Sequence, residues 1–367
     1  MDIGQVFGEI TANYFTTPEF LSSHLTGRAL KEEFPVTNAY CIGCTIGCGR
    51  TTYLEKDGKE IKIDGPEYET TAAYGPLCGI TDMKPILELN HLSNQEGIDT
   101  ISAGVSIAFL IYLVENKIGI EKIENHLANI KLEDIKWGNS KMVKILLNKT
   151  INREGIGSLI AEGTRKMAQD LKVNPDLAAH VKGLEIPMHD PRAYVAQGLN
   201  YMTSCVGASH KKGDYYEIDG DSTSFPSLKL KKKDRFVIKR KERHVITLQD
   251  LRAIDDSAIY CNFVNLRFPL TIEFFNAATG FNYDKNSLLM CGERMNNLKR
   301  LISCKLGLTR EDDSLPKIIT QPLESSSTKG IALNLEENLK NYYGIRGWDW
   351  ETGCPTQEKL KELNLKL

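Results

Sequence analysis

Apolar residues recur at helical spacing along most of this chain. The pattern predicts helices over residues 21–34, 82–95, 100–116, 139–148, 156–171, 244–263, 270–278, 286–304 and 356–365. Alternation of apolar and polar residues is confined to residues 52–63, where Asp57-Gly58 predicts the turn of a small β-hairpin. Strands and helices do not alternate, and no repeat recurs at a solenoid period. We therefore predict a mostly α protein.

The helical pattern is interrupted once in a way that suggests a domain boundary. Residues 171–177 contain Asn174-Pro175 and read as a linker. We expect two multihelical domains, residues 1–175 and 176–367, with the hairpin in the first. The second begins with a polar, loop-rich region at residues 183–210, whose composition is that of a site rather than of a scaffold.

Composition narrows the class of protein. The 367 residues, 41% hydrophobic and 26% charged, suffice for two domains with hydrophobic cores. A net charge of −2 gives no general attraction to nucleic acid or to an anionic membrane, so we expect neither as a partner. No apolar run reaches the ~20 residues of a membrane-spanning helix. No secretory signal region is visible. The nine cysteines cluster as a metal motif, which fits a reducing cytoplasm.

Three cysteines lie within eight residues, in the run Cys41-Ile-Gly-Cys44-Thr-Ile-Gly-Cys48. Thiolates on a short, glycine-rich loop with N–H donors suit an iron–sulfur cluster. A cubane cluster needs a fourth ligand, which must come from elsewhere in the fold. The alternative is a structural zinc site, although such sites usually contain two C-x₂-C pairs or a Cys₂His₂ set. The C-x₂-C-x₃-C spacing of this run is the reverse of the C-x₃-C-x₂-C spacing usual in radical-SAM enzymes, so that class of enzyme is disfavoured.

Cys261 is a candidate for the missing ligand. It comes five residues after Asp256, at the end of a predicted helix. A lone cysteine in a helix is commonly an inert hydrophobic residue, and this reading stays open. The remaining cysteines have no comparable acidic or turn context: Cys78, Cys205, Cys291, Cys304 and Cys354.

Paired carboxylates follow the hairpin. Glu67 and Glu69 flank Tyr68 after a Gly-Pro turn, and buried carboxylates can exchange protons with a substrate. Capping of the helix that follows is the alternative explanation, and from sequence alone it is preferred.

Two polar turns offer further candidates. Asp190 and Arg192 either pair with each other or bind an anionic ligand, and His210 follows a Gly-Ala-Ser turn. The turn of residues 94–99 lies between two apolar helices, and Asp99 suits the N-cap of the second.

Residues 229–243 are strongly basic. A solvated helix face accounts for such a run in most proteins. The functional alternative is docking of an acidic electron carrier by complementary charge.

In their order along the chain, these motifs resemble the aldehyde ferredoxin oxidoreductase family. The resemblance rests on the cysteine loop with the following Gly-Arg, on Gly65-Pro-Glu-Tyr-Glu69, on the motif from Asn94 to Asp99, on Arg153-Glu-Gly-Ile-Gly, on Asp190-Pro-Arg192, on Cys291-Gly-Glu-Arg-Met-Asn-Asn-Leu, and on Tyr343-x-x-Arg346-Gly-Trp348. It implies a tungsten bispterin beside a [4Fe–4S] cluster, and oxidation of aldehydes to acids with ferredoxin as acceptor. Molybdenum in place of tungsten stays open.

The resemblance also implies roles for individual residues. The expected cluster ligands are Cys41, Cys44, Cys48 and Cys261. Glu69 and His210 are expected beside the metal as proton acceptor and donor, and Glu88 matches a second family glutamate. Cofactor binding is expected of Asn94, Gly97, Asp99, Asp190, Arg192 and Asp256.

The sequence departs from the family pattern in several places. Asn94 replaces an aspartate and Ile259 replaces a glycine of the pterin motifs, while Val206 and Ser209 stand where relatives commonly have Arg and Cys. Asparagine at position 94 lacks the negative charge of the family's aspartate, which would strengthen hydrogen bonds from pterin N–H groups. Cofactor geometry or substrate is therefore expected to differ.

Nothing in the sequence resembles the β-rich N-terminal domain on which the bispterin sits. We expect that domain to come from a missing segment or a partner chain, and this polypeptide alone to be inactive. The alternatives are a reductive family member acting on a carboxylate or aromatic thioester, an electron-transfer subunit with only the [4Fe–4S] cluster, and a zinc domain.

Overall fold

The computed structural model describes residues 1–20, 22–56 and 58–365. The chain folds into two compact units, which are described separately. The first contains Met1–Asp190 and Pro316–Ile331, and the second contains Pro191–Leu315 and Ala332–Leu367. The division falls between Asp190 and Pro191, later than the boundary expected between residues 175 and 176, and the first unit includes a segment from late in the chain.

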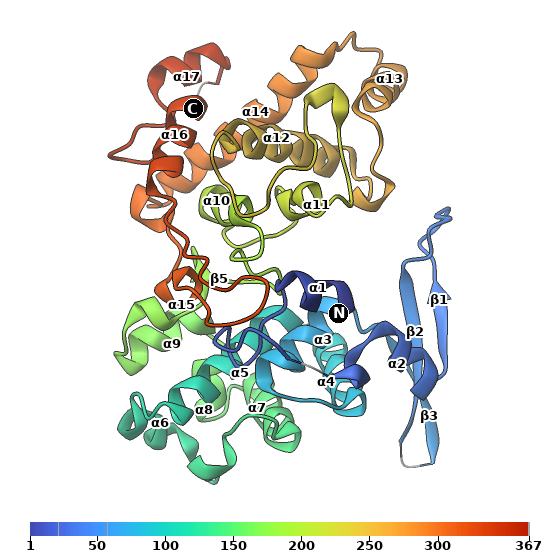
Figure 1. Ribbon diagram of the computed structural model, residues 1–367, viewed down its shortest axis with the longest axis vertical. Helices are drawn as coiled ribbons and strands as arrows, with labels where there is room; N and C mark the ends of the chain where they lie inside the picture. Colours follow the sequence, from blue (N-terminus) through green and yellow to red (C-terminus); the bar gives the residue numbers. More distant parts are fainter. Residues whose placement is uncertain (21, 57, 366–367) are drawn as a thin grey trace. The chain divides into compact units, whose positions relative to one another are not determined.

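Helices make up most of the first unit (Figure 1). They are α1 Asp2–Phe7, α2 Gly27–Glu33, α3 Tyr68–Tyr74, α4 Met83–Glu96, α5 Thr100–Glu115, α6 Ile120–Leu127, α7 Ser140–Asn152, α8 Ile156–Ile160, α9 Gly163–Leu171 and α15 Lys317–Thr320.

Helix α5 runs through the core of the first unit. Its residues from Ala103 to Ile111 are all buried. The side chain of Asp99 caps the helix by accepting the N–H groups of Ile101 and Ser102. A Cβ at Gly104 would come within 2.7 Å of Ala73 Cβ, so glycine permits the close approach of α3.

The first unit also contains a three-stranded antiparallel sheet, in the order β1 Val36–Ala39, β2 Gly49–Lys56 and β3 Lys59–Asp64 (Figure 1). The cysteine loop connects β1 to β2. The pairing of β2 with β3 confirms the expected hairpin, although Asp57 of its turn lies outside the described residues.

Residues 176–190 pack with the first unit because of a second, two-stranded sheet, β4 His180–Val181 and β5 Leu184–Glu185. The buried Glu185 carboxylate accepts the backbone N–H of Thr164 at 2.8 Å and its hydroxyl at 3.2 Å. This contact holds β5 against the start of α9.

The late segment Pro316–Ile331 is an integral part of the first unit. Lys317 pairs with Asp176 at 2.9 Å, and Ile319 is buried. A Cβ at Gly8 would come within 2.9 Å of atoms of Ser327 and Thr328, so the segment also lies against the end of α1.

The second unit consists of α10 Val195–Thr203, α11 Tyr215–Asp219, α12 Glu242–Ala258, α13 Phe268–Thr279, α14 Lys285–Lys305, α16 Glu336–Arg346 and α17 Gln357–Glu362 (Figure 1). Helix α12 packs against α10, α14 and α16. A Cβ at Gly292 of α14 would come within 2.3 Å of the Asp250 carbonyl oxygen, so glycine permits the close approach of α14 to α12.

Buried ion pairs are frequent in the second unit. Arg346 donates to Asp250 at 2.7 Å and Arg300 to Asp313 at 2.8 Å, with all four side chains at most 7% exposed. A disulfide joins Cys304 to Cys354, with their Cα atoms 6.0 Å apart, and the sequence did not predict it.

The mostly α fold is confirmed. The helix expected over residues 156–171 is divided into α8 and α9, and the sequence did not predict α6, α10, α11 and α16. Helix α10 lies within residues 183–210, which were expected to be loop-rich. The basic run 229–243 is not a helix face: α12 begins only at Glu242, and Lys241 is buried. No helix among the described residues is long and apolar enough to cross a membrane.

Candidate functional site

The three cysteines of the loop between β1 and β2 are free thiols, and none forms a disulfide. Cys41 and Cys48 are exposed and Cys44 is half-buried. The Ile46 N–H donates to Cys44 Sγ at 3.4 Å, and the Cys44 N–H closes a turn with the Cys41 carbonyl. Thiols with backbone N–H donors on one short loop fit the donor set of an iron–sulfur cluster.

Glycine is required in the middle of this loop. Gly47 has φ +60°, a left-handed conformation that side chains rarely adopt. A Cβ there would come within 2.2 Å of the Tyr40 ring. Gly43 has φ +72° in open space. The Tyr40 ring therefore packs directly on the backbone between Cys44 and Cys48.

Cys261 is an exposed free thiol in the second unit, just after α12. Helix α12 ends at Ala258, and its C-cap residue Ile259 has a φ of +57° in the left-handed region. Ile259 is also 92% exposed, so little packing compensates the strain. This conformation explains why glycine suits the position in the pterin motif. That Cys261 joins the other three cysteines stays a prediction.

A cluster of ionisable groups surrounds Glu69, near the start of α3. Tyr68 Oη donates to Glu69 Oε1 at 3.1 Å and also hydrogen-bonds to His189 Nε2. His189 Nε2 lies 3.5 Å from Glu69 Oε1, and its Nδ1 lies 3.0 Å from Glu9 Oε2. The Met188 N–H donates to Glu69 Oε2 at 2.8 Å. Glu69 lies in the first turn of α3, but this helix has no side-chain cap hydrogen bond, so the cluster and not a cap engages the Glu69 carboxylate.

Burial raises the pKa of Glu69, and the nearby Glu9 carboxylate adds to this effect. His189, the Met188 N–H and the Tyr68 hydroxyl oppose it, because each stabilises the carboxylate. A buried carboxyl group that is also stabilised as a carboxylate by its neighbours can accept a proton and release it again. His210 lies in the second unit, so its meeting with Glu69 stays a prediction.

The residues expected to bind pterin from the first unit form the exposed turn between α4 and α5. Asn94 Nδ2 donates to the Asp64 carbonyl at 2.9 Å. Gly97 ends α4 with φ +69°, and Asp99 caps α5. These contacts fix the shape of the turn. Pterin binding by Asn94, Gly97 and Asp99 remains a prediction.

Glu88 and Asp190 have local partners in the first unit. Lys144 Nζ lies 2.5 Å from Glu88 Oε2, which links α7 to α4. Asp190 is 1% exposed and accepts the hydroxyl of Thr11 at 3.3 Å. Their expected roles near the cofactor stay predictions.

The second unit contains the other expected cofactor residues. Lys212 Nζ lies 2.5 Å from Asp256 Oδ2, in a pair whose side chains are about one-third exposed. Arg192, near the beginning of this unit, is 1% exposed. Cofactor binding by Arg192 and Asp256 stays a prediction.

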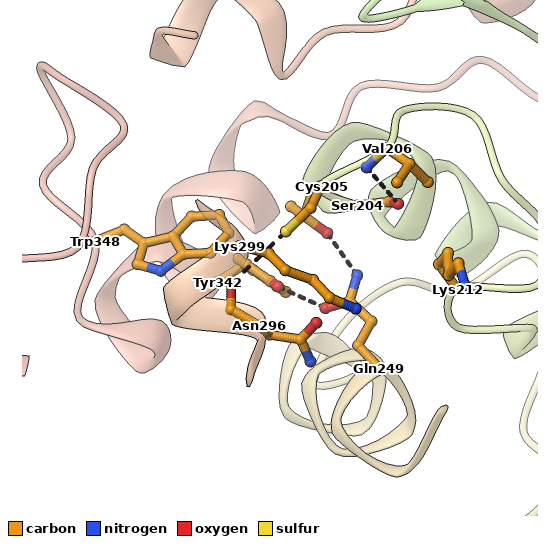
Figure 2. A pocket seen from close by; sticks show the side chains of 10 residues that line it. Ser204, Cys205, Val206, Lys212, Gln249, Asn296, Lys299, Tyr342 and Trp348 are labelled. Carbon is orange, nitrogen blue, oxygen red and sulfur yellow. Dashed lines mark hydrogen bonds between the residues drawn. The ribbon is translucent and has the colours of Figure 1, made fainter. Parts of the chain in front are cut away.

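A cavity of about 140 Å³ lies beside the loop that leads to His210 (Figure 2). Gln249 donates to Thr203 at 3.0 Å and accepts the Tyr342 hydroxyl at 2.5 Å. The Cys205 thiol donates to the Asn296 carbonyl. The other lining residues are Ser204, Val206, Lys212, Lys299 and Trp348. These contacts hold the loop before His210 in place.

The sequence did not identify Glu9 and His189 as partners of Glu69. His189 was visible only as the residue before the Asp-Pro-Arg motif, and Glu9 lies 180 residues away from it. No local pattern marks a pair at that separation. The recognisable signal was the polar composition of residues 183–210.

The multihelical fold, the free cysteines of the loop and the buried carboxylate point to an oxidoreductase. The chain belongs to the aldehyde ferredoxin oxidoreductase family: residues 1–365 match the description "Aldehyde ferredoxin oxidoreductase, domains 2 & 3".

Two relatives are tungsten-containing aldehyde ferredoxin oxidoreductases. The Pyrococcus furiosus protein is 35% identical over 93% of this chain and 54% of its own length. The Pyrococcus horikoshii protein is 34% identical over 97% of this chain and 57% of its own length. This chain therefore spans little more than half of these relatives.

Two further similarities extend the comparison. The WOR-like subunit of an aliphatic sulfonate oxidoreductase from Pyrococcus furiosus is 31% identical over 88% of this chain and 49% of its own length. The active-site complex BamBC of benzoyl coenzyme A reductase, solved with 1,5-dienoyl-CoA, has a TM-score of 0.73. That alignment is 19% identical and covers 98% of this chain and 58% of the solved chain. The second similarity concerns the fold alone.

Proposed function

We propose that this chain provides the two helical domains of a cytoplasmic tungsten bispterin oxidoreductase, which oxidises an aldehyde to a carboxylic acid and reduces ferredoxin. The observation that carries the proposal is Glu69, a buried carboxylate with a raised pKa among proton-exchanging neighbours. Family membership and the cysteine loop support it.

The chain's residues would hold two cofactors. Cys41, Cys44 and Cys48, with Cys261, would ligate a [4Fe–4S] cluster, and Asp99 and Asp256 belong to the motifs that would hold the bispterin. When bound, tungsten or molybdenum would supply the two-electron oxidation, and the cluster would pass the electrons on singly.

Protons are handled by the protein. Oxidation of an aldehyde and water to an acid releases two protons with two electrons. Glu69 would accept a proton at Oε1, where Tyr68 and His189 are within reach. His210 would be the second proton-exchanging group. The burial of Glu69 limits its contact with water and keeps its proton exchange directed to these neighbours.

The acceptor would be an acidic ferredoxin. The run from Lys229 to Arg243 exposes several cations in the second unit, and complementary charge favours the encounter with such a carrier. A reductive reaction on an aromatic thioester, or oxidation of an aliphatic sulfonate, are the alternatives that a substrate screen must include.

Cofactor content is the first test. After anaerobic purification, we expect about four iron atoms per chain, as one cubane cluster requires. Cys44→Ser should lose iron, while Cys291→Ser, outside the expected ligand set, should retain it. Zinc without iron would overturn the cluster assignment.

Activity is the second test, on the enzyme purified from its native source with all of its chains. We expect aldehyde-dependent reduction of ferredoxin. Glu69→Gln should abolish it, whereas Glu67→Gln, exposed and two residues away, should retain it. Turnover of only a thioester or a sulfonate would replace the proposed substrate class.

A further inference from the structure

His189 lies between two carboxylates of the first unit. Its Nδ1 lies 3.0 Å from Glu9 Oε2, and its Nε2 lies 3.5 Å from Glu69 Oε1 and contacts the Tyr68 hydroxyl. The His189 side chain is 5% exposed, and those of Glu9 and Glu69 are 12% and 10% exposed. Little water therefore competes with these contacts.

The backbone keeps Glu9 and His189 together. The Asp190 N–H donates to the Glu9 carbonyl at 2.8 Å, and the Thr11 hydroxyl donates to the Asp190 carboxylate at 3.3 Å. Glu9 itself is held by its N–H, which donates to the carbonyl of Gly4 within α1. Three hydrogen bonds thus fix the geometry of the Glu9–His189 contact.

This arrangement determines which way the imidazole faces. A carboxylate only accepts hydrogen bonds, so Nδ1 donates its proton to Glu9. Nε2 is then directed to Tyr68 and Glu69. A proton on Glu69 Oε1 can reach Nε2 directly, or through the Tyr68 hydroxyl, which gives one proton and takes another.

We propose that His189, oriented by Glu9, is a positioning residue that keeps Glu69 in its carboxylate form and takes over the proton that Glu69 accepts. The transfer breaks one O–H bond at Glu69 and forms one N–H bond at His189, and no electrons are exchanged with another group. The inference rests on the proposed role of Glu69 as proton acceptor.

The test is the titration of Glu69 in the purified chain, followed by NMR with carboxyl-¹³C glutamate. The Glu69 signal is the one missing from Glu69→Gln. The groups that face this carboxyl in the first unit are His189, Tyr68, Glu9 and the Met188 N–H. The readout does not need a metal or pterin, so it is independent of the cofactor tests above.

His189→Gln keeps a hydrogen-bonding side chain but removes the proton-accepting ring. We expect the Glu69 titration midpoint to move to higher pH, because the group that opposes the burial effect is lost. An unchanged midpoint would overturn the proposal. His24→Gln is the matched control, since His24 pairs with Glu33 at 2.8 Å on the surface of the same unit. If His189→Gln does not fold, His189→Asn serves the same comparison.

Glu9→Gln separates two ways in which Glu9 can act. If Glu9 acts through His189, the loss of the Glu9 carboxylate weakens the stabilisation of the Glu69 carboxylate by His189. The titration midpoint of Glu69 then rises. If Glu9 acts only as a like charge, its loss relieves repulsion and the midpoint falls. We expect a rise, and a fall would refute the assignment of Glu9.

Discussion

Arg252 binds Asp214 through two parallel hydrogen bonds, Nε to Oδ1 at 2.7 Å and Nη2 to Oδ2 at 2.8 Å. Its Nη1 donates to Asp255 at 2.7 Å, and all three side chains are at most 2% exposed. Asp214 follows His210 in the chain, and Asp255 lies shortly before Cys261. Arg252 therefore connects the loop with His210 to the helix end that leads to Cys261.

Removal of this guanidinium should be costly. Arg252→Met leaves two buried carboxylates without their partner, so we expect the free energy of unfolding to fall by about 3–5 kcal/mol. Denaturant titration measures the loss. Lys232→Met breaks an exposed pair with Asp221 in the same unit and should cost less than about 1 kcal/mol. Equal stability of the two variants would show that the buried network is not needed.

Ile259→Gly should stabilise the chain. A left-handed conformation costs a residue with a Cβ about 1–2 kcal/mol, and Ile259 makes little compensating packing contact at 92% exposure. The greater freedom of glycine in the unfolded chain takes back about 0.5–1 kcal/mol. We expect a net gain of roughly 0.5–1 kcal/mol in thermal or denaturant unfolding.

The control for Ile259→Gly is a substitution expected to change stability in the opposite direction. Ile302 is 46% exposed but lies within α14. Ile302→Gly should therefore destabilise the chain, because glycine is unfavourable inside a helix. A loss of stability in Ile259→Gly as well would contradict the strain argument.

Two glycines of the cysteine loop allow a matched comparison. Gly47→Ala must both adopt a strained φ and displace the Tyr40 ring, whereas Gly43→Ala meets only the strain. We expect Gly47→Ala to lower the iron content per chain more than Gly43→Ala. Tyr40→Ala added to Gly47→Ala should restore part of the iron. Identical iron content in both single variants would mean that the Tyr40 contact does not shape the loop.

Asp219 should make stability depend on pH. Burial raises its pKa to about 6 although Lys241 lies 2.5 Å away, and burial also lowers the pKa of Lys241. The folded protein thus holds the Asp219 proton more tightly than the unfolded chain, whose aspartates titrate near ~3.9. This stabilisation is complete below pH ~4 and is lost as the pH rises through ~6.

Asp219→Asn should remove that pH dependence. We expect the difference in unfolding free energy between the wild type and Asp219→Asn to change by about 2 kcal/mol between pH ~4 and pH ~7. Denaturant titrations at several pH values measure it. Asp221→Asn, an exposed neighbour, should follow the wild type. A constant difference across this range would mean that Asp219 stays ionised when buried.

Local sequence patterns predicted most helices and the hairpin, and they failed where residues far apart in the chain determine the structure. The apolar spacing identified α4, α5 and α14, and the Asp-Gly signal identified the hairpin of β2 and β3. The helix expected over residues 156–171 is divided before α9, whose first residue Gly163 adopts φ +79° beside the Glu185 carboxylate. That carboxylate comes from a strand 22 residues further on, and periodicity cannot register it.

The site was predictable to a similar extent. Cys41, Cys44 and Cys48 are neighbours in the chain, so their grouping follows from sequence alone. For Glu69, helix capping was the simpler explanation, and only the fold shows its burial against His189. Burial of a carboxylate depends on residues far away in the chain, which a single sequence does not reveal.

The return of Pro316–Ile331 to the first unit has a consequence for biosynthesis. The chain passes between the units three times, after Asp190, Leu315 and Ile331. The first unit therefore lacks one of its own segments until most of the second has been translated. Ribosome-bound intermediates that end before Pro316 would expose the surface near Asp176 and Gly8 that this segment covers. Final consolidation of the first unit is thus post-translational or late co-translational, and the N-terminal part of the chain must wait for residues synthesised more than a hundred positions after it.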